Sequence, residues 1–288
     1  MNPDLLPSPL IKFAPDFLRR VGALTGRLVS SSQRREGRGN STLFGSGEEF
    51  VGYRAYRAGE DLRLLDWSLL ARLDQPLVRV CKREASEEWC VVLDTSASMG
   101  IGIPGKLQVA AEVAVAVTAL GARAKARVTV WTTADTESRV VRRTEDVASL
   151  MRWIETKRAS SEQGLRPLLP KLKLRGVGRV FLLGDFFDVD LAAVQGIRRP
   201  GQELFLLRIL AQEELVPELS ESTEWVDAET GAVHRVRVDS ETRNAYELEL
   251  SHELESWREF SAKHRIGCGC FSSTTAFESI VQSVLSPN

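Results

Sequence analysis

The sequence predicts an α/β fold with an open, mostly parallel, doubly wound sheet. From residue 86 onward, short and continuous apolar runs alternate with longer helical segments, and such runs are typical of parallel strands covered on both faces. The chain has 288 residues, of which 43% are hydrophobic, so it can bury a full core. The alternation of strand and helix favours right-handed crossovers between parallel strands.

The expected elements of this sheet can be placed in order. The predicted strands are residues 89–94, 126–133, 178–185, 203–210 and 265–271, and the predicted helices are 106–124, 145–155, 164–172, 249–265 and 275–285. Segment 106–124 is apolar around nearly its whole helical surface, so we expect it to be buried against the sheet. Alternating polarity around a Glu-Thr-Gly turn predicts an inserted β-hairpin at about 223–239.

Three regions are expected along the chain. Residues 1–42 contain prolines and then a polar, glycine-containing stretch, which predicts a short helix followed by a flexible linker. Residues 43–85 are predicted to be a β-rich extension that packs on the main domain. Residues 86–288 are expected to form that domain, including the inserted hairpin.

Composition excludes several classes of protein. The net charge is −1 with 27% charged residues, which fits neither a disordered acidic chain nor an overall basic nucleic-acid binder. No apolar run approaches the roughly 18 residues that a membrane helix needs, and the N-terminus does not look like a signal peptide. The four cysteines form no CxxC pair, which favours a reducing compartment. We therefore expect a cytoplasmic protein without membrane insertion.

The stretch WCVVLDTSASMG, residues 89–100, places oxygen-bearing side chains where a predicted strand ends. Asp94, Ser96 and Ser98 follow that strand, and Asp185 ends a later one. Ligands of open α/β sheets bind at the carboxyl ends of the strands, and oxygen ligands suit Mg²⁺, Ca²⁺ or Mn²⁺ rather than zinc. The pattern predicts a divalent metal site, although Asp and Ser at a strand end can also simply cap a helix.

These residues resemble the metal-ion-dependent adhesion site of the von Willebrand factor A fold. Asp94, Ser96 and Ser98 match its Asp-x-Ser-x-Ser motif, and Asp185 matches its later aspartate. The resemblance implies Mg²⁺, with Mn²⁺ or Ca²⁺ as alternatives, and an open position that a partner's carboxylate fills. The family's threonine on a second loop has no clean match here. Ser161 is the best substitute, and Glu162 is the next.

A second segment, residues 45–72, mixes arginines, carboxylates and aromatic rings. Its prominent residues are Arg54, Tyr56, Asp61, Arg63, Asp66, Trp67 and Arg72. Arg forks bind carboxylates bidentately, so the segment could form an ion-pair network that holds it on the main domain, or a docking surface for a partner. The interleaved acids argue against nucleic acid, because they would repel phosphates.

This segment resembles the signature of the bacterial domain-of-unknown-function 58 family, and the likeness extends over about residues 43–285. The resemblance implies a non-catalytic adaptor that works with a MoxR-type AAA+ ATPase in protein assembly or maturation. The alternative is a scaffold with a degenerate, metal-free site that binds partners through residues 45–72.

A remote alternative is a phosphate-ester hydrolase with Asp94 as its nucleophile. Ser96 stands where the acidic residue of such phosphatases is needed, and a hydroxyl cannot protonate a leaving group as a carboxyl can. We therefore expect no enzymatic activity. Cys268 and Cys270 share one face of a predicted strand, and they are expected in the core rather than in a redox site.

Overall fold

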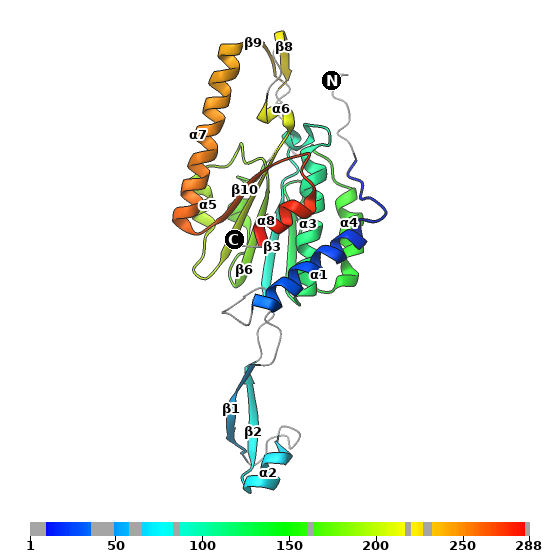
Figure 1. Cartoon of the computed structure of the whole chain (residues 1–288), viewed down its shortest axis with the longest axis vertical. Helices are drawn as coiled ribbons and strands as arrows, with labels where there is room; N and C mark the ends of the chain where they lie inside the picture. The colour runs from blue at the N-terminus through cyan, green and yellow to red at the C-terminus, as the bar shows by residue number, and fades with distance from the viewer. Residues whose placement is uncertain are drawn as a thin grey trace.

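The computed structural model describes residues 10–35, 49–57, 65–82, 87–160, 164–216, 220–226 and 232–285 (Figure 1). Its centre is a six-stranded sheet with the order β10-β7-β6-β3-β4-β5. The strands are β3 (Glu88–Leu93), β4 (Arg127–Thr132), β5 (Arg139–Val141), β6 (Val177–Gly184), β7 (Glu203–Leu210) and β10 (Gly267–Ser272). All neighbours pair in parallel except β4 and β5. The predicted open, mostly parallel sheet is confirmed.

Helices cover both faces of the sheet, which makes the fold doubly wound (Figure 1). One face carries α1 (Phe17–Arg35), α3 (Lys106–Arg123), α4 (Val147–Glu155) and α8 (Phe277–Leu285), and the other carries α5 (Leu191–Ile197) and α7 (Ser240–His264). Successive side chains of a strand point to opposite faces. Accordingly Val91 and Leu93 join the core under the first set of helices, while Cys90 and Val92 join the core under the second.

Helix α3 lies at the centre of the first layer and is buried over most of its length. Its many alanines and valines leave room for a close approach to the sheet, and at Gly121 an added Cβ would lie 2.7 Å from the Trp89 ring. A helix that is apolar nearly all round needs such an environment. The expectation of a buried helix at 106–124 is confirmed.

Helix α1 belongs to the core of this domain. Phe17, Val21, Leu24 and Leu28 are buried in the same cluster as α3, and the Arg20 guanidinium donates two hydrogen bonds to the Glu278 carboxylate of α8, at 2.7 and 2.8 Å. The helix has 19 residues. The structure therefore places the helix of region 1–42 on the main domain, and it is longer than the short one expected.

Several boundaries differ from the sequence prediction. Residues 164–172 form turns and the 3₁₀ helix η5 (Leu169–Lys171) instead of an α-helix, because proline lacks a backbone N–H and obstructs a helix interior, and Pro167 and Pro170 both lie there. Helix α7 begins at Ser240, earlier than predicted, where the Asp239 carboxylate caps it by accepting from Thr242 N. The edge strand β5 was not predicted.

Two small hairpins complete the described chain. Strands β8 (Ser220–Val226) and β9 (Val233–Val238) are antiparallel, which confirms the hairpin expected at about 223–239. Strands β1 (Glu49–Ala55) and β2 (Leu77–Lys82) are also antiparallel, with α2 (Trp67–Leu73) between them. Figure 1 shows this second unit apart from the sheet. The packing of residues 43–85 on the main domain stays a prediction.

Candidate functional site

The candidate site lies at the carboxyl edge of the sheet, where β3 and β6 end side by side. Asp94 follows β3 and Asp185 follows β6, and their exposed fractions are only 1% and 2%. The backbone continues the pairing of the two strands, since Asp94 N donates to Leu183 O at 2.8 Å. Parallel pairing therefore brings two buried aspartates to one place, as the sequence predicted.

The two carboxylate oxygens of Asp94 have different surroundings. Oδ1 accepts hydrogen bonds from Ser96 N at 2.8 Å and from Thr133 Oγ1 at 3.3 Å. Oδ2 is buried and has no hydrogen-bond partner among the described residues. A buried acceptor without a partner is costly, so Oδ2 is an acceptor that a hydrogen-bond donor or a cation could satisfy.

Ser96 and Ser98 stand on the loop that follows Asp94. Their hydroxyl oxygens are 3.1 Å apart, and Ser96 precedes the 3₁₀ helix η3 (Ala97–Gly100) without a side-chain capping bond to it. The Asp94 side chain does bond to Ser96 N, so part of the helix-cap interpretation applies to Asp94. The two hydroxyls are not used as caps.

The charge state of Asp94 depends on this environment. Burial, and next the negative charge of Asp185, raises the pKa of Asp94 to about 7. Burial in a low dielectric disfavours the ionised form, and a neighbouring like charge adds to that effect. A cation bound directly to Asp94 would oppose both effects, because an opposite charge favours the ionised carboxylate.

Lys106, which the sequence analysis missed, supplies a positive charge at the same edge. It is the first residue of α3 and is completely buried. Its Nζ lies 2.8 Å from Asp185 Oδ2 and 2.6 Å from Glu214 Oε1, where Glu214 belongs to α6 (Gln212–Leu215). Glu214 Oε2 also accepts from Ala211 N at 2.7 Å. A lysine at a helix start gave no signal in the sequence that it turned inward.

Hydroxyls from the next strand also reach the site. Thr133, just after β4, has its Oγ1 2.8 Å from Thr95 N and 3.3 Å from Asp94 Oδ1. The sequence signal for Thr133 was the pair of threonines that ends the predicted strand 126–133, because neighbouring parallel strands end at the same edge of the sheet. The substitutes Ser161 and Glu162 lie outside the described residues. Their neighbour Ser160 donates from its backbone N to Thr95 O at 3.2 Å.

The donor set fits a hard divalent cation in part. Asp94, Ser96 and Ser98 supply only oxygen atoms, which such ions prefer, and Asp94 Oδ2 is unpaired among the described residues. Within those residues no cluster of three or more His, Cys, Asp or Glu side chains is placed to hold a metal. Asp185 Oδ2 is engaged by Lys106.

Residues 52–255, more than half of the chain, match the family described as "Protein of unknown function DUF58". The chain belongs to this family. A search of curated proteins found no match. The matched residues of this DUF58 protein include both aspartates of the site and Lys106.

Solved structures give only distant likenesses. The chain is similar to the conserved hypothetical protein BatB from Bacteroides thetaiotaomicron, with 15% identity, a TM-score of 0.41, and coverage of 69% of this chain and 97% of that one. It is also similar to an aerotolerance-related membrane protein from Bacteroides fragilis NCTC 9343 that carries multiple mutations to serines. That match has 15% identity, a TM-score of 0.37, and coverage of 69% and 96%.

The segment 45–72 of this DUF58 protein is described in part. Asp66 caps α2, since its Oδ1 accepts from Ser68 N and Leu69 N, both at 3.1 Å, and its Oδ2 accepts from Tyr53 OH at 3.3 Å. Trp67 is 60% exposed. Of the other predicted residues, Arg54, Tyr56 and Arg72 lie in the described part of the chain, and Asp61 and Arg63 lie outside it. Asp66 thus has a structural role at the start of α2, whereas the Trp67 side chain beside it is mostly exposed.

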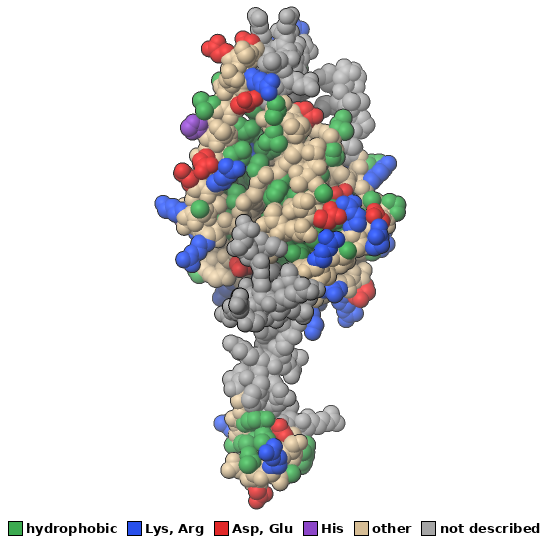
Figure 2. All heavy atoms as spheres, viewed as in Figure 1, with side chains coloured by type: hydrophobic (Ala, Val, Ile, Leu, Met, Phe, Trp, Pro, Cys, Tyr) green, Lys and Arg blue, Asp and Glu red, His purple; other side chains and the backbone are tan. Residues whose placement is uncertain are grey.

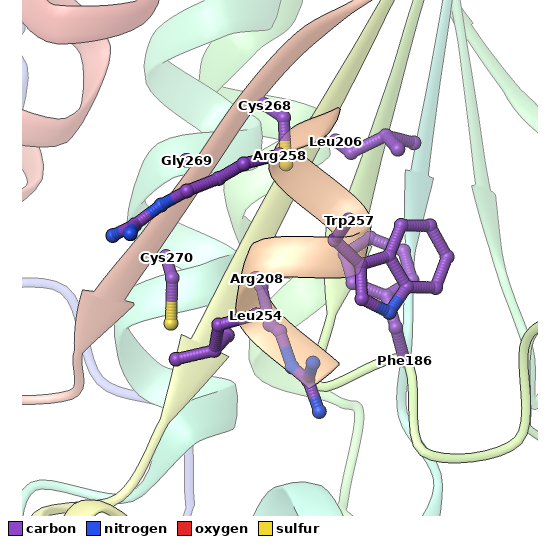
Figure 3. Close-up of a pocket in the computed structure, with 9 residues that line it drawn as sticks. All are labelled: Phe186, Leu206, Arg208, Leu254, Trp257, Arg258, Cys268, Gly269 and Cys270. Carbon is purple, nitrogen blue, oxygen red and sulfur yellow. The ribbon is translucent and has the colours of Figure 1, made fainter. Parts of the chain in front are cut away.

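Cys268 and Cys270 lie on the edge strand β10 rather than in the core. Cys268 is exposed and Cys270 is half-buried, so the expectation of core cysteines was wrong, because β10 ends the sheet. Both line a small pocket with Arg208, Arg258 and Trp257 (Figure 3). The pocket has a volume of about 30 Å³, room for roughly one or two water molecules rather than an organic ligand.

None of the helices in the described part of the chain combines the length and the hydrophobicity that a membrane-spanning segment requires.

Proposed function

We propose that this protein is a non-catalytic adaptor that binds a partner protein through a divalent metal ion, in the manner of a von Willebrand factor A domain. Asp94, Ser96 and Ser98 would hold Mg²⁺, with Asp185 beside them and Mn²⁺ or Ca²⁺ as substitutes. The bound ion would offer an open coordination position to a carboxylate of the partner. The observation that carries this proposal is the buried, unpartnered oxygen Asp94 Oδ2.

The surroundings of the site support a protein partner. Ile101 and Ile103, on the loop after the serines, are 38% and 92% exposed, and Phe187, two residues after Asp185, is 51% exposed. Exposed apolar side chains beside a site are typical of a surface that a protein partner covers, because the core of a protein interface is largely apolar. A fitting partner would present an Asp or Glu flanked by apolar residues.

The partner class rests on the family resemblance. We propose a MoxR-type AAA+ ATPase, or a client of one, as the protein that supplies the carboxylate. The adaptor would then act in protein assembly or maturation without chemistry of its own.

The direct experiment is a Mn²⁺ titration by calorimetry of wild type, Asp94→Asn and Asp190→Asn. Asp190 is the matched control: it caps α5 by accepting from Ala193 N, and asparagine caps equally well. We expect binding by wild type and Asp190→Asn and none by Asp94→Asn. Binding that persists in Asp94→Asn would place the metal elsewhere.

A second candidate function uses residues 45–72 without metal. No residue of α2 is buried, and Figure 2 shows hydrophobic, basic and acidic side chains together on this small unit. An exposed tryptophan is a common centre of an interface. If this surface binds the partner, a purified MoxR-type ATPase should co-sediment with the protein in the presence of a chelator, and Trp67→Ala should abolish that association.

A further inference from the structure

The buried ammonium of Lys106 is the feature of the site that the proposed function does not use. Lys106 Nζ is enclosed by Asp185 Oδ2 at 2.8 Å, by Glu214 Oε1 at 2.6 Å and by the Phe187 ring, whose centroid lies 5.4 Å away. The side chain is completely buried. A buried ammonium is tolerated only when it is well paired, and here both of its carboxylates come from the carboxyl edge of the sheet.

The position of Lys106 on its helix makes this arrangement more costly. Lys106 is the first residue of α3, and Gly105 precedes it as the N-cap without a side-chain bond. The N-terminus of a helix carries partial positive charge, which disfavours a cation. Desolvation and the helix dipole both oppose the ammonium, so Asp185 and Glu214 must hold it in place.

The same carboxylate is needed by the proposed metal site. Asp185 offers one oxygen to Phe187 N at 3.3 Å and the other to Lys106 Nζ at 2.8 Å. A divalent ion on Asp94 with Asp185 in its shell would stand close to the ammonium in a buried, weakly screened place. The two cations would repel each other and would share one ligand.

We infer that Lys106 is a tethered cation that competes with the divalent ion for Asp185 and thereby lowers the metal affinity of the Asp94 site. The inference rests on the proposed function, since it concerns the same site. The occupancy of the Asp94 site by the divalent ion then depends on anything that moves the Lys106 ammonium away from Asp185. Glu214 is the alternative place for it, and its helix α6 is tied to α7 because Tyr246 OH donates to Glu214 O at 2.7 Å.

The test compares the Mn²⁺ affinity of wild type with that of variants on either side of the ion pair. Lys106→Met should bind Mn²⁺ about tenfold tighter or more, because it removes a nearby positive charge in a poorly screened site. Glu214→Gln should bind more weakly than wild type, because the cluster loses a negative charge and the ammonium is left to Asp185 alone. Opposite directions would exclude simple loosening of the site, which would move both affinities the same way.

Two controls define the comparison. Lys157→Met removes another mostly buried, paired lysine, whose Nζ is 2.8 Å from Asp135 and whose side chain is 12% exposed, and it should leave the affinity unchanged. Asp94→Asn combined with Lys106→Met should abolish the gain. Circular dichroism checks the fold of each variant, and Lys106→Gln, whose neutral amide keeps hydrogen-bond donors near the carboxylates, serves if the methionine variant is unfolded.

The outcomes separate this inference from the proposed function. A wild type that binds Mn²⁺ through Asp94, with equal or weaker binding by a folded Lys106→Met, would overturn the inference and keep the proposed function. A flat wild-type titration together with Asp94-dependent binding by Lys106→Met would support the inference and show that the natural lysine keeps the site metal-free. No binding by either protein would overturn both.

Discussion

Gly184 shows how a single residue makes room for the site. It is the last residue of β6, and an added Cβ would lie 2.8 Å from Asp94 Cβ, 2.9 Å from Asp94 Oδ2 and 3.0 Å from Leu165 Cδ1. All three atoms belong to buried side chains of a packed core, where added volume forces neighbours to shift. The buried carboxylate therefore depends on the absence of a side chain on the neighbouring strand.

Gly184→Ala should destabilise the protein by about 1–3 kcal/mol, because the new methyl group overpacks this place. Gly196→Ala is the matched control. Gly196 lies in α5 and has no atom within 4 Å of its added Cβ, so alanine should stabilise the helix by about 0.5–1 kcal/mol. Urea unfolding of both variants measures the difference. Equal effects would mean that the carboxyl edge can rearrange around a methyl group.

The carboxyl group of Glu112, in α3, should make the stability of the protein depend on pH. Burial raises the pKa of its carboxyl above the ordinary 4.5, although Gln108 Nε2 donates to Oε1 at 2.8 Å. A raised folded pKa means that the folded state binds the proton more tightly than the unfolded state does. This contribution to stability is fully present below the ordinary pKa and is lost as the pH rises through the folded value.

Glu112→Gln should therefore be more stable than wild type at neutral pH, and this advantage should shrink to nothing as the pH falls below about 4.5. The amide retains an acceptor for Gln108 and never ionises. Urea midpoints across the acid-to-neutral range measure the effect. A pH-independent difference between the two proteins would show that ionisation of Glu112 does not matter for stability.

At the scale of the element, α1 is part of the domain although it lies far from the sheet in sequence. Phe17 is 1% exposed and packs on Phe13 and Phe277, with ring centroids 4.9 Å away in both cases. Its neighbour Leu18 is 44% exposed. Adjacent residues of one helix thus face the core and the surface.

Phe17→Ala should lower the free energy of unfolding by about 3–5 kcal/mol, as expected for a large cavity in a core. Leu18→Ala should change it by no more than about 0.5 kcal/mol. Both values come from chemical denaturation followed by tryptophan fluorescence. A small effect of Phe17→Ala would mean that α1 can leave the domain without disturbing the core.

At the scale of the whole molecule, the sheet domain and the β1–α2–β2 unit have separate hydrophobic contacts. The two core clusters of the sheet domain contain none of the described residues 49–57 and 65–82. Within the small unit, Val78 is 3% exposed and pairs with Leu65 through an isolated bridge. Figure 1 shows the unit at a distance from the sheet. The two parts should therefore unfold independently.

Val91→Ala should lower the unfolding free energy of the sheet domain by roughly 2 kcal/mol, because Val91 is completely buried in the central strand β3. Val78→Ala should leave that transition unchanged and reduce amide-exchange protection only in β1 and β2. A lower midpoint of the sheet domain in Val78→Ala would instead support the sequence prediction that residues 43–85 pack on it.

Much of the fold could be predicted because it depends on local pattern. Buried parallel strands read as continuous apolar runs, so five of the six strands were placed within a residue or two. The edge strand β5 has three residues, too few to show a pattern in the sequence. At 164–172 the apolar spacing predicts a helix, but Pro167 and Pro170 prevent one. Helix α7 begins at Ser240, after the Asp239 cap. Its first turns are polar, so the apolar spacing in the sequence predicts only its later part.

The sequence by itself determined the α/β class and the meeting of Asp94 and Asp185, because parallel strands end at one edge and each aspartate directly follows its strand. Only the tertiary structure decided what surrounds them. Lys106 and Glu214 are 108 positions apart, and Thr133 comes from another strand end. Their contact with the site depends on the direction of side chains in the packed protein, and burial then requires that each charge find an opposite one.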